Sequence, residues 1–278
     1  MKFTIPRRTS QIIFLILAIG GFTGFTAMHL INPFLHCYAC PFATAACPVG
    51  ILQRFITLGE IPWYPLGAIA IYGLLLGRAF CGWACPFGLM QDMADKVNKR
   101  KLKISRPIHQ KATMVKFVGV AVIVLAAWWA SDVLFCKICP AGTLEASIPY
   151  YIQNGLTVTA FFIGKISLFI VILASIFLIS RSWCRYLCPF GAILAPFNKT
   201  SLVHVEVDSE KCTDCGVCKS ACPMNIEVTK DRKSLECIKC GKCIDSCPSD
   251  ALYFKIMPSL KKIKCNRTGE NENNIPTN

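Results

Sequence analysis

The chain has 278 residues, of which 54% are hydrophobic and only 17% are charged, and its mean hydropathy is +0.47. This composition is too apolar for an ordinary soluble protein and indicates the membrane class. The formal charge of +14 is typical of a membrane protein with a basic cytoplasmic side. The 18 cysteines exceed what packing requires and, in a chain that faces the cytosol, indicate metal ligation.

Four apolar segments approach the length of about 20 residues that a helix needs to cross about 30 Å of hydrocarbon. They are Gln11–Ile31, Trp63–Phe80, Thr113–Phe135 and Val158–Ile179. Lysine and arginine gather before the first segment and after the second and fourth, whereas the other two loops contain only Arg54 and Lys137. The positive-inside rule then predicts a multi-pass protein of the cytoplasmic membrane, with both termini in the cytoplasm.

Cysteine motifs repeat between the two halves of this apolar region. CGWACPFG begins at Cys81 and CRYLCPFG at Cys184, an offset of 103 residues, while CYACP at Cys37 and CKICP at Cys136 are offset by 99. Spans one and two therefore correspond to spans three and four, and both halves begin on the same side. For residues 1–200 we predict an α-helical membrane bundle of four transmembrane helices in two parallel repeats.

Residues 201–257 are predicted to form a cytoplasmic α+β domain of the bacterial 2[4Fe–4S] ferredoxin type. CTDCGVCKSACP and CIKCGKCIDSCP both have the spacing C-x₂-C-x₂-C-x₃-C-P, in which the fourth cysteine of each run binds the other cluster. The predicted ligands are Cys212, Cys215, Cys218 and Cys247 for cluster 1, and Cys237, Cys240, Cys243 and Cys222 for cluster 2. Gly216 and Gly241 are predicted to leave room for the backbone beside the clusters.

The two CPFG motifs predict a further site on the cytoplasmic side of the membrane domain. Cysteines four residues apart face one direction on a helix, and the repeat axis would bring the two pairs together. The candidate ligands of this inner site are Cys81, Cys85, Cys184 and Cys188. Packed thiols are the alternative, but packing does not account for the repeated Pro-Phe-Gly.

A second set of cysteines lies on the predicted outer side. By the same symmetry, the candidates for an outer cluster are Cys37, Cys40, Cys136 and Cys139. Cys47, in the sequence CPVG, competes with Cys40 as a ligand, and the sequence does not decide between them. Disulfides are the other interpretation, because an oxidising exterior permits them. Clusters at both sites would allow electrons to cross the bilayer.

These motifs resemble the NapH/MauN type of membrane-bound 4Fe-4S ferredoxin, which is related to the membrane part of NosR-like proteins. The resemblance covers about residues 11–254 and rests on Cys81–Gly88, Cys184–Gly191 and the two ferredoxin runs. It implies an iron–sulfur subunit that relays electrons between the quinone pool and a partner redox protein or oxidoreductase complex. Two [4Fe–4S] clusters are expected in the C-terminal domain, with one or two more in the membrane domain. The outer cysteines depart from the nitrate-reductase member of this group.

Other functional signals are absent from the sequence. It contains no C-x-x-C-H, G-x-G-x-x-G or P-loop motif, so haem c and bound nucleotide are not indicated. The basic run over residues 96–111 is interpreted as an anchor on anionic lipid and not as a nucleic-acid site.

Without a catalytic constellation, the chain is interpreted as a non-catalytic electron-transfer subunit. An assembly or redox-regulatory factor for a metalloenzyme is the alternative. The tail, residues 258–278, is predicted to be disordered.

Overall fold

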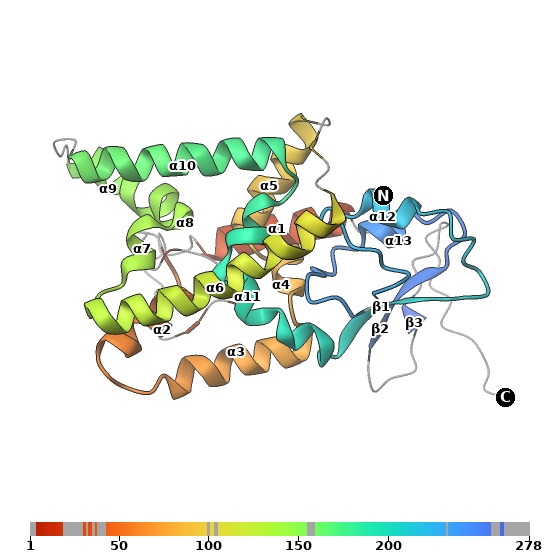
Figure 1. Ribbon diagram of the computed structural model, residues 1–278, viewed down its shortest axis with the longest axis horizontal. Helices are drawn as coiled ribbons and strands as arrows, with labels where there is room; N and C mark the ends of the chain where they lie inside the picture. The colour runs from red at the N-terminus through yellow and green to blue at the C-terminus, as the bar shows by residue number, and fades with distance from the viewer. Residues whose placement is uncertain are drawn as a thin grey trace.

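The computed structural model describes residues 4–18, 30–31, 33–34, 37, 43–98, 101–102, 105–154, 159–231, 233–256 and 262–263. Helices dominate up to residue 200, and the three described strands follow (Figure 1). The elements in chain order are α1 (Thr4–Ala18), α2 (Pro48–Thr57), α3 (Trp63–Leu76), α4 (Ala79–Trp83), α5 (Pro86–Val97), α6 (Arg106–Ala130), α7 (Leu134–Ile138), α8 (Pro140–Gly142), the π-helical turn η2 (Thr143–Ser147), α9 (Ile148–Asn154), α10 (Ala160–Leu178), the π-helical turn η3 (Trp183–Leu187), α11 (Pro189–Leu194), the 3₁₀ turn η4 (Pro196–Lys199), β1 (Val203–Val207), α12 (Val217–Ala221), α13 (Lys242–Asp245), β2 (Leu252–Ile256) and β3 (Lys262–Ile263).

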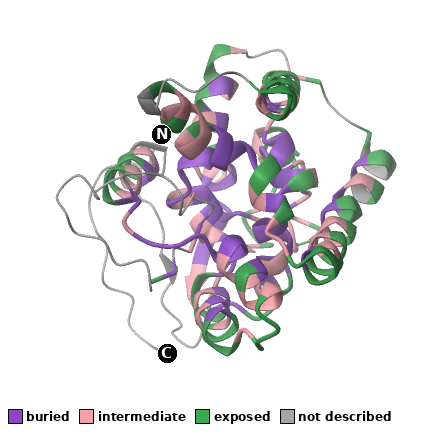
Figure 2. Cartoon of the chain, turned by 90° about the vertical axis from the view of Figure 1, so that its left-hand side faces the viewer, coloured by how far each residue is buried: buried purple, intermediate pink, exposed green. Residues whose placement is uncertain are grey.

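Two described helices are long and apolar enough to cross a membrane, namely α10 and the Lys111–Ala130 part of α6. Only 17% of each span is buried, and large apolar side chains such as Ile170 and Val122 are exposed on them. Figure 2 shows exposed residues along the outer faces of the helices. An exposed apolar surface of this extent is typical of membrane contact. The helix α3 is apolar but shorter, and α1 is described only as far as Ala18. The four-span arrangement is therefore supported for the third and fourth segments and stays a prediction for the first and second.

The second predicted span, Trp63–Phe80, is broken near its end. The helix α3 stops at Leu76, Gly77 has a positive φ of 55°, and α4 begins at Ala79. A Cβ atom on Gly77 would lie 2.4 Å from Oδ1 of Asn198, so only glycine fits both the backbone conformation and the space. Because of this break, the first cysteine motif does not continue the helix α3.

The C-terminal domain is built on a small antiparallel sheet. Strands β1 and β2 pair from Val203↔Ile256 to Val207↔Leu252, and β3 pairs with β2. Val205 and Val207 of β1 and Leu252 and Phe254 of β2 are buried in one cluster with Ile244 of α13 and cysteines of the neighbouring loops. Of the tail from residue 258, which is predicted to be disordered, the structure describes Lys262 and Ile263, and these two residues pair with β2 as β3. The rest of that tail lies outside the described residues.

The C-terminal domain packs closely on the helical domain. One apolar core contains the cysteines of the inner CPFG motifs together with Met224, Ile226 and Ile238 of the C-terminal domain. The indole N–H of Trp83 donates to the carbonyl oxygen of Lys239 at 2.8 Å. The closely spaced cysteines of the second ferredoxin run therefore lie directly against the helical domain.

Candidate iron–sulfur sites

The four cysteines predicted for cluster 1 line one small cavity in the C-terminal domain. Cys212, Cys215 and Cys218 come from the first run, and Cys247 comes from the end of the second. The charge of Cys218 interacts with those of Cys212 and Cys247. The fold thus brings the last cysteine of the second run to the first three cysteines of the first, which is the arrangement that crossed ligation needs.

The four cysteines predicted for cluster 2 also lie together. Cys243 interacts electrostatically with Cys240, Cys237 and Cys222, the last of which belongs to the first run. Burial raises the pKa of Cys237 to about 12, so a bare thiol here would stay protonated at neutral pH. Bound metal removes that proton, because a metal ligates the thiolate.

The two runs share one backbone conformation. Asp214 and Lys239, which precede the second cysteine of each run, have φ of 50° and 51°. Gly216 and Gly241, which follow it, have φ of 70° and 76° and stand immediately before α12 and α13. No protein atom lies within 4 Å of a Cβ placed on Gly216, and its positive φ is a conformation that favours glycine.

The structure brings the four cysteines of the two CPFG motifs together, and we call these thiols the inner set. Cys81 and Cys85 come from α4 and the start of α5, while Cys184 and Cys188 come from η3 and the start of α11. All four are buried, and Cys85 is close enough to the other three for their thiolate forms to interact electrostatically. Their ligation of a cluster stays a prediction, but the required convergence of side chains from both repeats is present.

The Pro-Phe-Gly that follows each inner cysteine pair has a structural reason. Cys85 and Cys188 cap their helices with nearly equal backbone angles, φ −68° and ψ 119° against φ −67° and ψ 114°. Proline is favoured in the first turn, where its missing N–H is not needed. The N–H of Gly191 donates to Sγ of Cys188 at 3.4 Å, and a Cβ on Gly88 would lie 2.8 Å from the carbonyl oxygen of Cys81. The motif therefore folds the chain tightly around both thiols.

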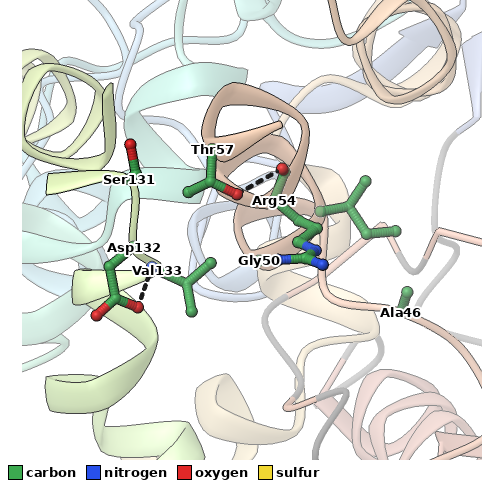
Figure 3. Close-up of a pocket in the computed structure, with 8 residues that line it drawn as sticks. Ala46, Gly50, Arg54, Thr57, Ser131, Asp132 and Val133 are labelled. Carbon is green, nitrogen blue, oxygen red and sulfur yellow. Dashed lines mark hydrogen bonds between the residues drawn. The ribbon is translucent and has the colours of Figure 1, made fainter. Parts of the chain in front are cut away.

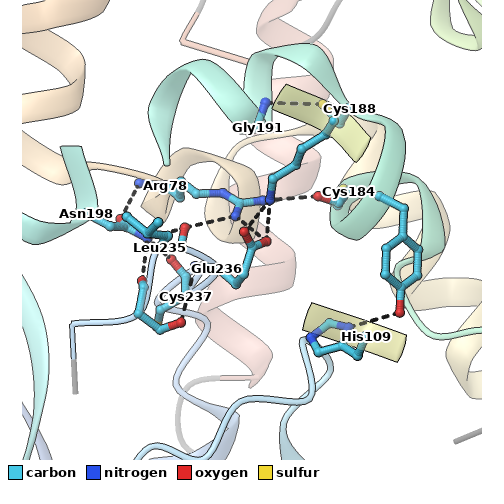
Figure 4. Close-up of polar contacts among 12 residues, drawn as sticks. Arg78, His109, Cys184, Cys188, Gly191, Asn198, Leu235, Glu236 and Cys237 are labelled. Atoms are coloured by element: carbon cyan, nitrogen blue, oxygen red, sulfur yellow. Dashed lines mark hydrogen bonds and ion pairs between the residues drawn. The ribbon is translucent and has the colours of Figure 1, made fainter. Parts of the chain in front are cut away.

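A buried arginine precedes each inner cysteine pair. Nη2 of Arg78 donates to the carbonyl oxygen of Cys184 at 3.1 Å, and its Nη1 binds Glu236 of the C-terminal domain at 2.8 Å (Figure 4). Arg181 forms the corresponding ion pair with the carboxylate of Asp92. Burial alone would raise the pKa of Asp92, but the charges of Arg181 and Arg7 hold it below its usual range.

Sequence reasoning missed these polar groups around the inner set. Gln91 is fully buried, and its Nε2 donates to Sγ of Cys184 at 3.0 Å. Hydrogen bonds to sulfur tune the potential of an iron–sulfur cluster. The arginines were signalled by the repeat, because Arg78 and Arg181 share the offset of 103 residues, whereas nothing local marks Gln91 or Glu236.

The inner set and the cysteines of cluster 2 are neighbours. Arg181 interacts electrostatically with Cys184 of the inner set and with Cys240 of cluster 2. A Cβ on Gly82 would lie 2.4 Å from the carbonyl oxygen of Ile238, so the two cysteine loops touch through their backbones. The arrangement suits one-electron transfer between two adjacent metal centres.

The outer cysteines lie at the opposite end of the molecule. Figure 1 shows α2, α7 and α8, which carry or follow these cysteines, at the end of the long axis away from the C-terminal domain. Cys47, Cys136 and Cys139 interact electrostatically, and Cys37 interacts with Cys139. Cys40 lies outside the described residues.

An open pocket of about 470 Å³ lies beside this outer group of cysteines. Its lining includes Ala46 and Gly50, which flank Cys47 closely in sequence, and the polar side chains of Arg54 and Asp132 (Figure 3). In the described part of the chain, this region included, no three His, Cys, Asp or Glu side chains are close enough to bind a single metal ion. A cluster does not need its ligands to meet at one metal ion, because each of its thiolates binds a different iron atom.

The crossed cysteine runs and their cavity define an iron–sulfur protein, and comparisons with known proteins agree. A family described as "4Fe-4S binding domain" matches residues 65–105 and 156–205, and a "4Fe-4S dicluster domain" matches residues 204–248. The first match covers the inner set and the second covers both ferredoxin runs. The chain is therefore an iron–sulfur electron-transfer protein that carries [4Fe–4S] clusters.

Several curated proteins are similar to this chain. The uncharacterized protein MJ0750 of Methanocaldococcus jannaschii is 32% identical over 66% of this chain and 75% of its own length. The putative electron transport protein YccM of Escherichia coli is 31% identical over 59% of this chain and 46% of its own length. The methylamine utilization ferredoxin-type protein MauN of Methylorubrum extorquens is 32% identical over 56% of this chain and 52% of its own length.

Ferredoxin-type proteins named NapH also match, at 25% and 28% identity. The chain belongs to the NapH/MauN-type family of 4Fe-4S ferredoxin-type proteins. It spans about half the length of YccM, MauN and NapH. No solved structure matches the chain.

Proposed function

We propose that this protein is a membrane-bound electron-transfer subunit that relays single electrons between the quinone pool and a partner redox protein. The observation that carries the proposal is the contact between the inner set and the cysteines of cluster 2, which share Arg181 as a neighbour. With a cluster on each set, an electron passes between the inner cluster and cluster 1 by way of cluster 2. Cluster 1 lies in the more exposed loop, since Cys215 is exposed, and is the natural point of contact for the partner.

In this proposal the inner cluster is bound by Cys81, Cys85, Cys184 and Cys188. Burial raises the pKa of Cys85 and Cys188, and four buried thiols have little reason to converge without a metal centre. The flanking guanidinium groups of Arg78 and Arg181 offset the net charge of about −2 that a [4Fe–4S]²⁺ core with four thiolates carries. The remaining ligands are those predicted for clusters 1 and 2.

The proposed placement has four helices in the cytoplasmic membrane and the C-terminal domain in the cytoplasm. Its support is the apolar surface of α6 and α10 and the distribution of lysine and arginine along the chain. Protease added to sealed inside-out vesicles is expected to remove the C-terminal domain, whereas protease added to right-side-out vesicles is expected to leave it intact. The reverse pattern would contradict this orientation.

The relay is tested by electron exchange with a quinone in lipid nanodiscs under anaerobic conditions. A soluble quinol should reduce the clusters, or a soluble quinone should oxidise dithionite-reduced clusters, as followed by EPR of clusters 1 and 2. Whichever exchange the wild type shows should be lost in the Cys184→Ser/Cys188→Ser variant, while dithionite still reduces its ferredoxin clusters. Equal exchange rates in the variant and the wild type would contradict the relay.

The same preparation separates the relay from an assembly factor. A relay subunit is expected to copurify with its redox partner in a fixed ratio and to remain necessary for electron flow after the partner is complete. If electron flow through the mature partner continues without this protein, the assembly role is the correct one.

A further inference from the structure

The outer cysteines converge from both repeats, as those of the inner set do. A Cβ on Gly142 would lie 3.4 Å from Sγ of Cys37 and 3.8 Å from Cβ of Cys139. Cys47 interacts electrostatically with both Cys136 and Cys139. We call Cys37, Cys47, Cys136 and Cys139 the outer set. Its four thiols come from segments up to about a hundred residues apart and meet at one place.

The helix starts of the outer set copy those of the inner set. Cys47 caps α2 with φ −70° and ψ 127°, and Cys139 caps α8 with φ −63° and ψ 128°. Both are followed by Pro-x-Gly, as Cys85 and Cys188 are. The N–H of Gly142 donates to the thiol of Cys139, as that of Gly88 does to Cys85. Cys47, and not Cys40, is therefore the structural counterpart of Cys139.

A buried glutamine repeats as well. Gln53 lies six residues after Cys47, and Gln91 lies six residues after Cys85. Nε2 of Gln53 donates to Sγ of Cys136 at 3.5 Å, and Nε2 of Gln91 donates to Sγ of Cys184 at 3.0 Å. In both sites, then, a glutamine of the first repeat donates to the leading thiol of the second. This shared detail exceeds what packing of thiols requires.

Opposite charges complete the outer site. Lys165 of α10 interacts with Cys37, Cys136 and Cys139, and its Nζ donates to Oγ of Ser147 at 2.6 Å. An acid contacts the set as well, since the carboxylate of Glu145 accepts the backbone N–H of Cys37 at 2.7 Å. A lysine inside an apolar span is costly and usually marks a function. Here its charge faces thiols that become anionic when they bind metal.

We propose that the outer set binds an iron–sulfur cluster through Cys37, Cys47, Cys136 and Cys139. Four thiolates are the usual ligand set for such a cluster, and the site repeats the glutamine, the glycine and the cation of the inner one. The protein then has redox centres at both ends of its helical domain. Binding of this cluster does not depend on the quinone relay, so either proposal can fail without the other.

The test is metal analysis of the full chain purified anaerobically in detergent. Relative to the wild type, the Cys136→Ser/Cys139→Ser variant is expected to lose about four irons and four acid-labile sulfides per chain while the ferredoxin EPR signals remain. Cys47→Ser is expected to lose the same iron, whereas Cys40→Ser, the matched control, is expected to keep it. Unchanged iron in the double variant, or loss with Cys40→Ser in place of Cys47→Ser, would overturn the assignment.

The wild type alone also decides the matter if the variants do not accumulate. About sixteen irons, no stoichiometric zinc, and full alkylation of Cys37, Cys47, Cys136 and Cys139 after cluster removal without reductant are expected. Eight or fewer irons, one zinc per chain, or a disulfide among these four cysteines would each overturn the outer cluster, and so would twelve irons with these four cysteines open to alkylation before cluster removal.

Discussion

Arg78 and Arg181 cross between the two repeats and bind each other's cysteine motifs. Nη2 of Arg78 donates to the carbonyl oxygen of Cys184 at 3.1 Å, and Nη1 of Arg181 donates to the carbonyl oxygen of Cys81 at 3.0 Å. Both guanidinium groups are fully buried. Each therefore holds the other repeat's thiols in position while its charge faces the inner set.

Replacing either arginine by lysine should loosen the inner set. Lysine keeps the charge but cannot reach the carbonyl oxygen and the carboxylate together, so Arg181→Lys should lose at least one charge-assisted hydrogen bond. We expect a loss of about 2 kcal/mol, or a fall in melting temperature of roughly 5 °C. Thermal unfolding in detergent measures this, with Arg54→Lys on the exposed surface as the control. A variant that melts like the wild type would contradict the bracing role.

Gly82→Ala should weaken the docking of the C-terminal domain. Its new Cβ would lie 2.4 Å from the carbonyl oxygen of Ile238, and such overpacking costs about 1–3 kcal/mol. Limited proteolysis should then release the C-terminal domain faster than in the wild type. Gly119→Ala is the matched control, because nothing lies within 4 Å of its Cβ position. Equal release from both variants would argue against this contact.

Glu236 joins the C-terminal domain to two cations of the helical domain, Arg78 and Lys116. Burial would raise the pKa of Glu236, but these two charges lower it below its usual value. A depressed carboxyl pKa adds stability that is complete above the unfolded pKa of about 4.3 and is lost as the pH falls through the folded pKa. Docking through Glu236 should therefore be constant between pH 7 and pH 5.

The Glu236→Gln variant should dock more weakly throughout that pH range, by about 3 kcal/mol, because it leaves a buried arginine without its partner. Protease release at pH 5, 6 and 7 measures the effect. Lys230→Gln, whose lysine side chain is 72% exposed, is the control. If wild-type docking weakened between pH 7 and pH 5, a group other than Glu236 would have to control it.

Gln91→Leu should lower the reduction potential of the inner cluster without removing iron. The N–H of Gln91 that donates to Cys184 stabilises the more negative, reduced cluster, so its loss disfavours reduction. We expect a shift on the order of 60 mV, the equivalent of a tenfold change in a one-electron equilibrium. An EPR-monitored redox titration measures it, and Met93→Leu on the exposed face of α5 is the control. An unchanged potential would show that this bond does not reach the cluster.

The sequence predicted the parts of the sites that local spacing determines. Both ferredoxin runs and both CPFG motifs fix their cysteines within a few residues of backbone, so the fold had little freedom to separate them. The choice between Cys40 and Cys47 stayed open because a constant offset of 99 residues pairs Cys40 with Cys139. The first repeat has seven more residues between Cys37 and Cys47 than the second has between Cys136 and Cys139, and only the helix starts reveal that Cys47 is the counterpart.

Long-range polar contacts were beyond sequence reasoning. Glu236 is 158 residues from Arg78 and carries no local motif. The break at Gly77 also escaped the hydropathy pattern, because that pattern records apolar character and not the crowding by Asn198 that stops the helix. Of the tail expected to be disordered, Lys262 and Ile263 join the sheet.

The measurement that tests the central claim most directly is the iron and acid-labile sulfide content of the full chain, purified anaerobically and quantified alongside EPR of the reduced protein. With clusters on the two ferredoxin runs, the inner set and the outer set, about sixteen irons and sixteen sulfides per chain are predicted, with EPR signals beyond those of two ferredoxin clusters. About eight irons would contradict the account, because the membrane cysteines would then hold no cluster and the relay would have no centre beside the quinone pool.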